Sequence, residues 1–282
     1  MDKIINADSL LEDIRSSKAR NSFDDMVNYM CAKPIPNELG ERMQLNGTLE
    51  QNHNLLANLL YSKENCDLAN YILNNRSMIS DYDAVNGYSW IYELDREILL
   101  ELDSRKFFAS VGALEHELIH LILAINHNNP KPQYVEMLSF FGEILSLEIL
   151  SKKHNNPDVY KDEIIRRFIS RVSRRVYTYQ FEDDFFKKQS EFFKKCYVSF
   201  YTYMLGFIFA IRLLDLYHSF PQKIIETFNS VLSGKQSVDS LLEDYHISLE
   251  DDATIESFKN MCDLYERFVN ERYNELDLHY VR

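Results

Sequence analysis

Apolar residues recur three or four positions apart along almost the whole chain, a spacing that places them on one face of an α-helix. Residues that break helices are scarce, since the 282 residues include only 7 glycines and 6 prolines. Turn-rich β architectures need more of both, because their tight turns use backbone conformations that these residues supply. We therefore predict an all-α fold, with at most a small β element near residues 97–102.

The composition limits the class of partner. Hydrophobic residues make up 45% of the chain, which is enough to bury a large core, and the formal net charge is -13. Non-specific binding to nucleic acid requires lysine and arginine to displace counterions from phosphates, so an acidic surface disfavours it. The same charge repels anionic membranes. We expect neither nucleic acid nor membrane as a partner.

The cysteines and the apolar segments point to a cytoplasmic protein. The four cysteines are widely spaced and form no CxxC pair, which argues against a disulfide framework and against a thiolate zinc site. The first residues are acidic and amphipathic, without the apolar core of a secretory signal. The most apolar stretch, 197–216, contains tyrosines together with Arg212 and Asp215, so we interpret it as a buried helix rather than a membrane span.

The apolar period and its breaks predict the order of helices. Two short helices are expected within 7–33 and two more within 48–80, with a Pro-rich break at 31–36. Further helices are expected at 107–126, 134–152, 159–175, 180–194, 197–217, 221–233, 237–244 and 252–276. We divide the chain into an N-terminal helical lobe at 1–80, which we expect to be a lid or a partner surface, and a catalytic domain at 81–282.

One of these predicted helices carries the motif HExxH, at His116-Glu117-Leu118-Ile119-His120. Positions i and i+4 of a helix lie on one face, one turn apart, so both imidazoles can bind the same metal ion. The glutamate beside them can handle a proton. This arrangement is typical of zinc hydrolases, with one zinc ion per chain.

A catalytic zinc site usually has three protein ligands and one open position. We predict Glu136 as the third ligand, because it lies on the next helix beyond a Pro-Lys-Pro turn that would fold back over the histidines. Glu143, seven residues further on, is expected to orient a ligand, or to be the third ligand itself. His127 is a rival, since some zinc proteases have the pattern HExxHxxGxxH; here the spacing is one residue longer and Leu123 stands at the glycine position.

Three ordered segments resemble the oligopeptidase F and thimet oligopeptidase family of zinc peptidases. They are HExxH at 116–120, the segment YVEMLSFFGE at 134–143 and the tyrosine-rich segment YVSFYTYMLG at 197–206. The tail at 228–249, followed by a long last helix, is similar too. The likeness covers about residues 100–275, and most of the family's large N-terminal half has no counterpart.

The resemblance implies a mostly helical metallopeptidase that cleaves oligopeptides or flexible protein segments. His116, His120 and Glu136 would hold the zinc ion, which activates a water molecule. Glu117 would act as general base and then as general acid. The resemblance also gives Tyr203, and after it Tyr197, as hydrogen-bond donors to the oxyanion.

The chain departs from the family pattern at several positions. Ile119 replaces a glycine, Leu123 and Lys195 replace histidines, and the stretch between the motif and Glu136 is shorter. These departures motivate a second hypothesis, a weakened or inactive peptidase-like scaffold that binds a peptide or protein partner. A third hypothesis is a helical interaction protein without metal.

Two further features carry predictions of their own. The arginine pairs 166–167 and 174–175 are interpreted as a basic helix face that pairs with the acidic surface, or alternatively as a site for a peptide C-terminus. Trp90, the only tryptophan, is expected to pack in the core.

Overall fold

The structure is a computed structural model that describes residues 16–41, 43–44, 47–74, 108–127, 131–188 and 191–280. Side-chain environments are described for the same residues except 108–109 and 174–199. Trp90, the expected β element at 97–102 and the predicted domain boundary at residue 80 lie outside these ranges, so those predictions remain untested.

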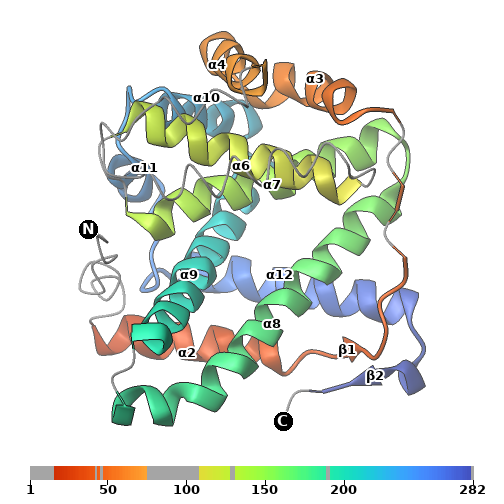
Figure 1. Ribbon diagram of the computed structural model, residues 1–282, viewed down its shortest axis with the longest axis vertical. Coiled ribbons are helices and arrows are strands. Elements are labelled where there is room, and N and C mark those ends of the chain that lie inside the picture. The colour runs from red at the N-terminus through yellow and green to blue at the C-terminus, as the bar shows by residue number, and fades with distance from the viewer. Residues whose placement is uncertain are drawn as a thin grey trace.

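Helices dominate the described residues, which confirms the predicted all-α class. Their bounds are α2 Ser17–Cys31, α3 Leu49–Leu60, α4 Lys63–Asn74, α6 Phe108–Asn126, α7 Pro132–Lys153, α8 Pro157–Lys188, α9 Glu191–Ser219, α10 Pro221–Leu232, α11 Val238–Asp244 and α12 Asp252–Arg272, with a 3₁₀ turn at Glu275–Asp277. In Figure 1, α3 and α4 cover the α6–α7 pair, α8 and α9 cross beneath it, and α12 and α2 follow below.

Several helices begin at residues that the sequence marks as helix starts. Ser16 and Asp251 cap α2 and α12 by accepting hydrogen bonds from backbone N–H groups in the first turn. Thr48 forms a reciprocal capping box with Gln51 at the start of α3. A proline occupies the first turn of α7 and of α10, where its missing N–H has no helical partner to lose.

Helix α7 lies at the centre of the fold and is buried around most of its circumference. It packs against α6, α8 and α9, with further contacts to α3. A helix that is surrounded in this way has no exposed stripe, and its polar residues must find partners inside the protein. The carboxylates of Glu136 and Glu143 are therefore placed in the interior by the packing of α7.

Two predicted helix breaks are wrong. The predicted helices at 159–175 and 180–194 are parts of longer elements, because α8 runs without interruption from Pro157 to Lys188 and α9 begins at Glu191. The segment between 175 and 180 contains β-branched and aromatic residues but no proline or glycine, so its low helix propensity is too small to end a helix. The next helix is expected to start at Tyr197, but this residue lies inside α9. The residues before it likewise include no proline or glycine that would end a helix.

The C-terminal two-thirds of α9 is long and apolar enough to cross a membrane. It spans Phe200–Ser219, and 72% of its apolar window is buried within the fold. The core helix of a folded domain passes the same test of length and composition. Burial against α7, α8, α10 and α12 accounts for the apolar character of this helix.

Two short strands form the described part of the sheet structure. In β1 (Ile35–Pro36) and β2 (Leu278–His279), Ile35 pairs with His279 and Pro36 with Leu278 in antiparallel register. This pairing joins the segment after α2 to the segment after α12. Strands this short carry no detectable alternation in the sequence, which explains why the apolar period did not predict them.

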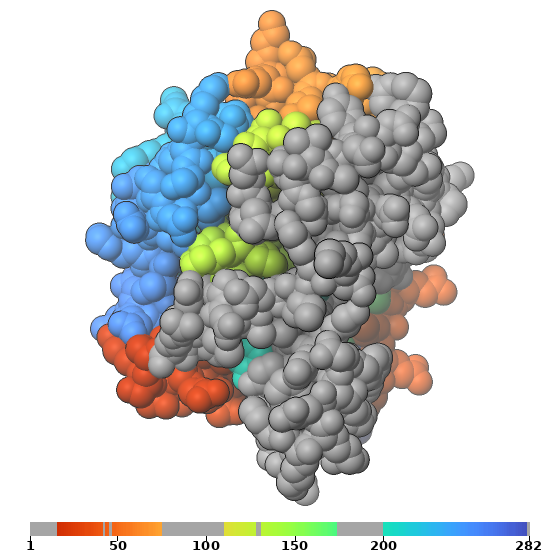
Figure 2. All heavy atoms as spheres, turned by 60° about the vertical axis from the view of Figure 1, so that its left-hand side comes forward, coloured from red at the N-terminus to blue at the C-terminus, as the bar shows by residue number. Residues whose placement is uncertain are grey.

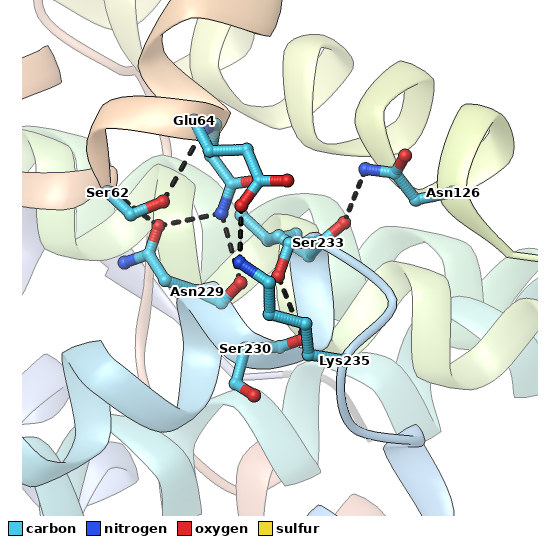
Figure 3. A network of polar contacts seen from close by, with 9 residues as sticks. Ser62, Glu64, Asn126, Asn229, Ser230, Ser233 and Lys235 are labelled. Atoms are coloured by element: carbon cyan, nitrogen blue, oxygen red, sulfur yellow. Dashed lines mark hydrogen bonds and ion pairs between the residues drawn. The ribbon is translucent and has the colours of Figure 1, made fainter.

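A polar network joins α4, α6 and α10 at one end of the motif helix (Figure 3). Asn229 accepts hydrogen bonds from the Ser62 backbone at 2.5 Å and from the Asn65 amide at 2.9 Å. Asn126, the last residue of α6, donates to the Leu232 carbonyl at 2.8 Å. The C-terminal end of the HExxH helix is thereby fixed to α10.

Candidate metal centre

Helices α6 and α7 bring three potential metal ligands together inside the protein. His116 and His120 come from one face of α6, and Glu136 comes from the first turns of α7. The residues are 8%, 8% and 7% exposed, and the two imidazole rings lie 4.7 Å apart between centroids. The two helices of the predicted hairpin therefore place Glu136 beside the histidine pair, as expected from the sequence.

The distances between the ligand atoms suit a small divalent cation. His116 Nε2 lies 3.4 Å from Glu136 Oε2, and His120 Nε2 lies 3.8 Å from Glu136 Oε1. One ligand atom from each residue can be chosen so that all lie within 4.8 Å of one another. Tetrahedral coordination with bonds near 2.0–2.1 Å places ligand atoms roughly 3.3–3.4 Å apart. This group can hold a metal ion with small movements of the side chains.

Helix α9 fixes the position of Glu136 through a glycine. A Cβ atom at Gly206 would lie 2.5 Å from Glu136 Cβ and 3.0 Å from the Met137 backbone nitrogen. Contacts this short do not occur, so α9 can cross α7 at this point only because residue 206 lacks a side chain. Gly206 ends the tyrosine-rich segment noted in the sequence, and its role here is to let α9 approach the backbone beside the ligand.

Glu143 lies behind His116 and bridges it to helix α8. Glu143 Oε2 lies 3.2 Å from His116 Nδ1, and the other oxygen forms an ion pair with Arg167. Burial alone would raise the pKa of Glu143, but Arg167 and the hydrogen bond with His116 outweigh burial and lower this pKa to about 2. Glu143 is thus an anion that can accept a hydrogen bond from the imidazole, the geometry expected of a residue that orients a metal ligand.

The two carboxylates also make His116 a strong base. Burial alone would lower the pKa of His116, but hydrogen bonds with Glu136 and Glu143 outweigh it and raise this pKa to about 10. The site therefore attracts positive charge, either a proton or a metal ion. The two compete, because a histidine must release a proton before it can bind a metal.

Ile119, which stands where the resembling family has glycine, is accommodated by a glycine on the facing helix. Ile119 is fully buried, and a Cβ atom added at Gly142 would lie 2.1 Å from its Cδ1 atom. The Ile119 side chain therefore fills the space over Gly142 on α7. It packs in the α6–α7 interface and leaves the three ligands together.

The predicted catalytic residues differ in how far the structure describes them. Glu117, which follows His116 in the sequence of α6, is half-buried. Tyr203 is half-buried on α9, and its ring lies 6.0 Å from Phe140, whose own ring lies 4.8 Å from His116. The side chain of Tyr197 lies outside the described residues, and the same holds for Lys195. The structure thus brings Tyr203 to the neighbourhood of the metal group through Phe140.

His127, the rival third ligand, has a different role. It follows the last residue of α6, and its Nε2 lies 2.6 Å from the Val231 carbonyl oxygen of α10. Among the described residues, the group that can hold a metal comprises His116, His120 and Glu136, without His127. His127 stands seven residues beyond His120, about two helical turns along the axis, where it contacts α10 instead of the ligand group.

The sequence interpretation missed the role of helix α8. Arg167 was expected to pair with the acidic surface, but it pairs with Glu143, which is only 3% exposed. Arg171, one turn later, is 4% exposed, and its guanidinium lies 4.4 Å from the Phe140 ring centroid and 5.6 Å from that of Tyr203. The spacing of Glu163, Arg167 and Arg171 at i, i+4 and i+8 is the signal of a single charged face.

A second buried histidine–glutamate pair lies next to the metal group in sequence. Glu115 accepts a hydrogen bond from Tyr61 at 2.7 Å, and its other oxygen lies 2.7 Å from His53 Nδ1. The side chains of His53 and Glu115 are 0% exposed. Burial alone would lower the pKa of His53, but attraction to Glu115 outweighs it and raises this pKa. The pair ties α3 to α6.

A cavity of about 670 Å³ lies elsewhere, between the start of α2 and the segment 239–251. Figure 2 shows this side of the molecule, with α2 in red below the blue C-terminal segments. Tyr134 and Phe209 contribute apolar surface, whereas Glu243, Glu250 and Asp251 contribute acidic groups. None of the residues of the metal group lines this cavity.

Comparisons with protein-family models, with curated proteins and with solved structures return no match for this chain. The chain is a mostly helical protein with a buried His116, His120 and Glu136 group that can hold a metal ion, and the two histidines have the spacing of HExxH.

Proposed function

We propose that this protein is a zinc-dependent metallopeptidase, a short and divergent relative of the oligopeptidase F and thimet oligopeptidase family. The observation that carries the proposal is the convergence of His116, His120 and Glu136 within 4.8 Å in the interior. Two nitrogen donors and one carboxylate are the ligand set of catalytic zinc sites in which one position is left for water. We propose one zinc ion per chain.

The residues of α6 have two proposed roles, metal binding and proton transfer. When bound, zinc supplies a Lewis acid that lowers the pKa of water and polarises the scissile carbonyl. Glu117 would accept the proton of the attacking water and deliver it to the leaving amine. His116 and His120 would hold the metal from the face of α6 that Glu117 adjoins, so the base would lie near the activated water.

Tyr203 is the proposed donor to the oxyanion, and Tyr197 is the second candidate for this role. A phenol donates a hydrogen bond and stays neutral near neutral pH, so it can stabilise negative charge that develops during the reaction. The position of Tyr203 beside Phe140, which packs against His116, supports this assignment. Both roles rest on the resemblance of the 197–206 segment to the family.

The proposed substrates are oligopeptides or flexible segments of proteins. The lobe at 1–80 would act as a lid or as a partner surface. We place the enzyme in the cytoplasm, without nucleic acid or membrane as a partner.

The proposal is tested with Glu117→Gln, which removes the base and leaves the three zinc ligands in place. Hydrolysis of a mixed peptide library, followed by mass spectrometry, is expected to fall by roughly 10²–10⁴-fold, while the zinc content stays that of the wild type. Glu271→Gln is a suitable control, because it changes an exposed carboxylate of α12 that pairs with Lys161. This control should retain full activity.

Full peptidase activity in Glu117→Gln would contradict the proposed mechanism. Zinc at one equivalent, with no cleavage of any library peptide by the wild type, would instead favour the peptide-binding scaffold. The departures from the family at Ile119 and Lys195 are the sequence features that favour this second function.

A further inference from the structure

Helices α7 and α8 face each other with two matched rows of residues beside the metal group. The row on α7 consists of Glu136, Phe140 and Glu143, and the row on α8 consists of Glu163, Arg167 and Arg171. Positions three and four residues apart lie on one face of a helix, so each row follows a single face. The rows make contact where Arg167 meets Glu143 and where Arg171 covers the Phe140 ring.

The Glu143 carboxylate uses its two oxygens in two directions. Oε1 forms the ion pair with Arg167, and Oε2 lies 3.2 Å from His116 Nδ1. Because a carboxylate is planar and rigid, anchoring one oxygen fixes the direction in which the other one accepts. If His116 binds a metal through Nε2, Nδ1 would carry the proton and would donate a hydrogen bond to Glu143 Oε2.

Burial makes Arg167 necessary for this arrangement. The Glu143 side chain is 3% exposed, so water cannot solvate its charge or hold its orientation. A buried carboxylate without a cationic partner is unfavourable and tends to rotate or become neutral. The Arg167 side chain is 25% exposed, and its Nη2 atom, which pairs with Glu143, also lies 3.7 Å from Glu163 Oε2.

We propose that Arg167 is a positioning residue of the metal centre. It holds Glu143 so that the second oxygen accepts from His116 Nδ1, which directs His116 Nε2 at the metal. Arg167 acts through Glu143 and His116 and does not touch the metal itself. The inference rests on the metal site of the proposed function, and it extends that site by one residue on a third helix.

The test measures zinc affinity by competition with a chromophoric chelator, for the full-length chain. Arg167→Gln is expected to raise the zinc dissociation constant by roughly 10–100-fold, the loss that partners of metal ligands commonly show. Arg166→Gln is the matched control. Arg166 is the neighbouring residue on α8, but it pairs with Asp162 at 2.8 Å and contacts the Gly40 carbonyl, away from the metal group. The zinc dissociation constant of Arg166→Gln should match that of the wild type.

Two further readouts separate positioning from general support of the fold. The double variant Arg167→Gln/Glu143→Gln should bind zinc as weakly as Glu143→Gln alone, because both residues act through one contact. In cobalt-substituted protein, the visible absorption bands should change in Arg167→Gln and in Glu143→Gln, and stay unchanged in Arg166→Gln. Additive losses in the double variant would contradict the proposal.

The outcomes distinguish this inference from the proposed function. A wild-type chain that binds no zinc would refute the metal site itself. A wild-type chain that binds zinc, with equal affinity in Arg167→Gln and Arg166→Gln, would overturn only the role of Arg167. If Arg167→Gln does not fold, Arg167→Lys and Arg166→Lys replace the pair. Lysine keeps the charge but not the planar fork, so the dissociation constant should rise at position 167 alone.

Discussion

Helix α6 carries two histidine–glutamate arrangements, and they differ although their residues adjoin. Glu115 is bound at 2.7 Å by both His53 and Tyr61, and the side chains of His53 and Glu115 are 0% exposed. One residue later, His116 lies 3.4 Å from Glu136, with side-chain exposures of 10% and 9%. In the first arrangement each partner lies 2.7 Å from a Glu115 oxygen, whereas in the second the nitrogens of His116 and His120 lie 3.4 and 3.8 Å from Glu136, separations that a cation can bridge.

The distances between donors and acceptors, rather than the residue types, distinguish a closed structural pair from a group that can hold a metal ion. Both arrangements are buried and both combine imidazole with carboxylate. In the pair of His53 and Glu115, each carboxylate oxygen has its own donor at hydrogen-bond distance, so no room remains for an ion. Around Glu136, two nitrogens from one face of α6 converge on one carboxylate, which is the pattern of metal ligands.

The largest expected effect is the response of stability to zinc. At a zinc concentration about 1,000 times the dissociation constant, binding should add about 4 kcal/mol to the free energy of unfolding of the wild type. His116→Ala should lose this gain, because it removes one of three ligands. His53→Ala should keep it. Denaturant unfolding with zinc and with chelator measures the gain, and an equal gain in both variants would contradict the assignment of His116, but not His53, as a metal ligand.

Removal of His53 should have the largest effect on the protein without zinc. His53→Ala leaves the Glu115 carboxylate buried with Tyr61 as its partner, and breaking a buried ion pair in this way costs about 3–5 kcal/mol. Chemical denaturation in the presence of chelator measures the loss. A loss below about 0.5 kcal/mol, as for an ordinary surface substitution, would show that this network is not structural.

Loss of the ion pair between His218 and Glu148, which lie 2.9 Å apart, should have the smallest effect on stability. The hydrogen bond with Glu148 raises the pKa of His218; burial alone would raise the pKa of Glu148, but the bonds with His218 and Lys152 lower it. The pair therefore stabilises the fold most between about pH 4.5 and 6.5, and this contribution is lost as pH rises through the pKa of folded His218.

The size of this contribution is limited by solvent. The His218 side chain is 47% exposed, so the pair should add no more than about 1 kcal/mol. The free energy of unfolding of His218→Gln should lie below that of the wild type at pH 5.5 and should approach it at pH 9. A difference that grows with pH would have the wrong sign and would contradict the assignment of the pair.

The sequence predicted those parts of the site that depend on local geometry. The spacing of His116 and His120 fixes them on one face once a helix forms, and the Pro-Lys-Pro turn fixes the hairpin that returns Glu136. Glu143 follows on the same helix. These residues lie within two consecutive helices, so the apolar period and one turn signal are sufficient to place them.

The parts that the sequence did not predict depend on contacts between distant segments. His53 and Glu115 are 62 residues apart, and Arg167 reaches Glu143 from a third helix whose rotation about its axis is set by packing. Nothing local marks Arg167 as different from Arg166, although Arg167 pairs with Glu143 beside the candidate metal group and Arg166 pairs with Asp162. The two-residue strands are likewise fixed by a pairing between the two ends of the described chain.

The metal content of the purified protein is the most direct test of whether His116, His120 and Glu136 form a metal centre. Elemental analysis of the wild type should give about one zinc ion per chain, and His120→Ala should give close to none. His53→Ala, which alters the other histidine–glutamate arrangement on α6, should retain the zinc of the wild type. A wild type without zinc, or a His120→Ala variant with the full complement, would contradict the assignment of this group as a metal centre.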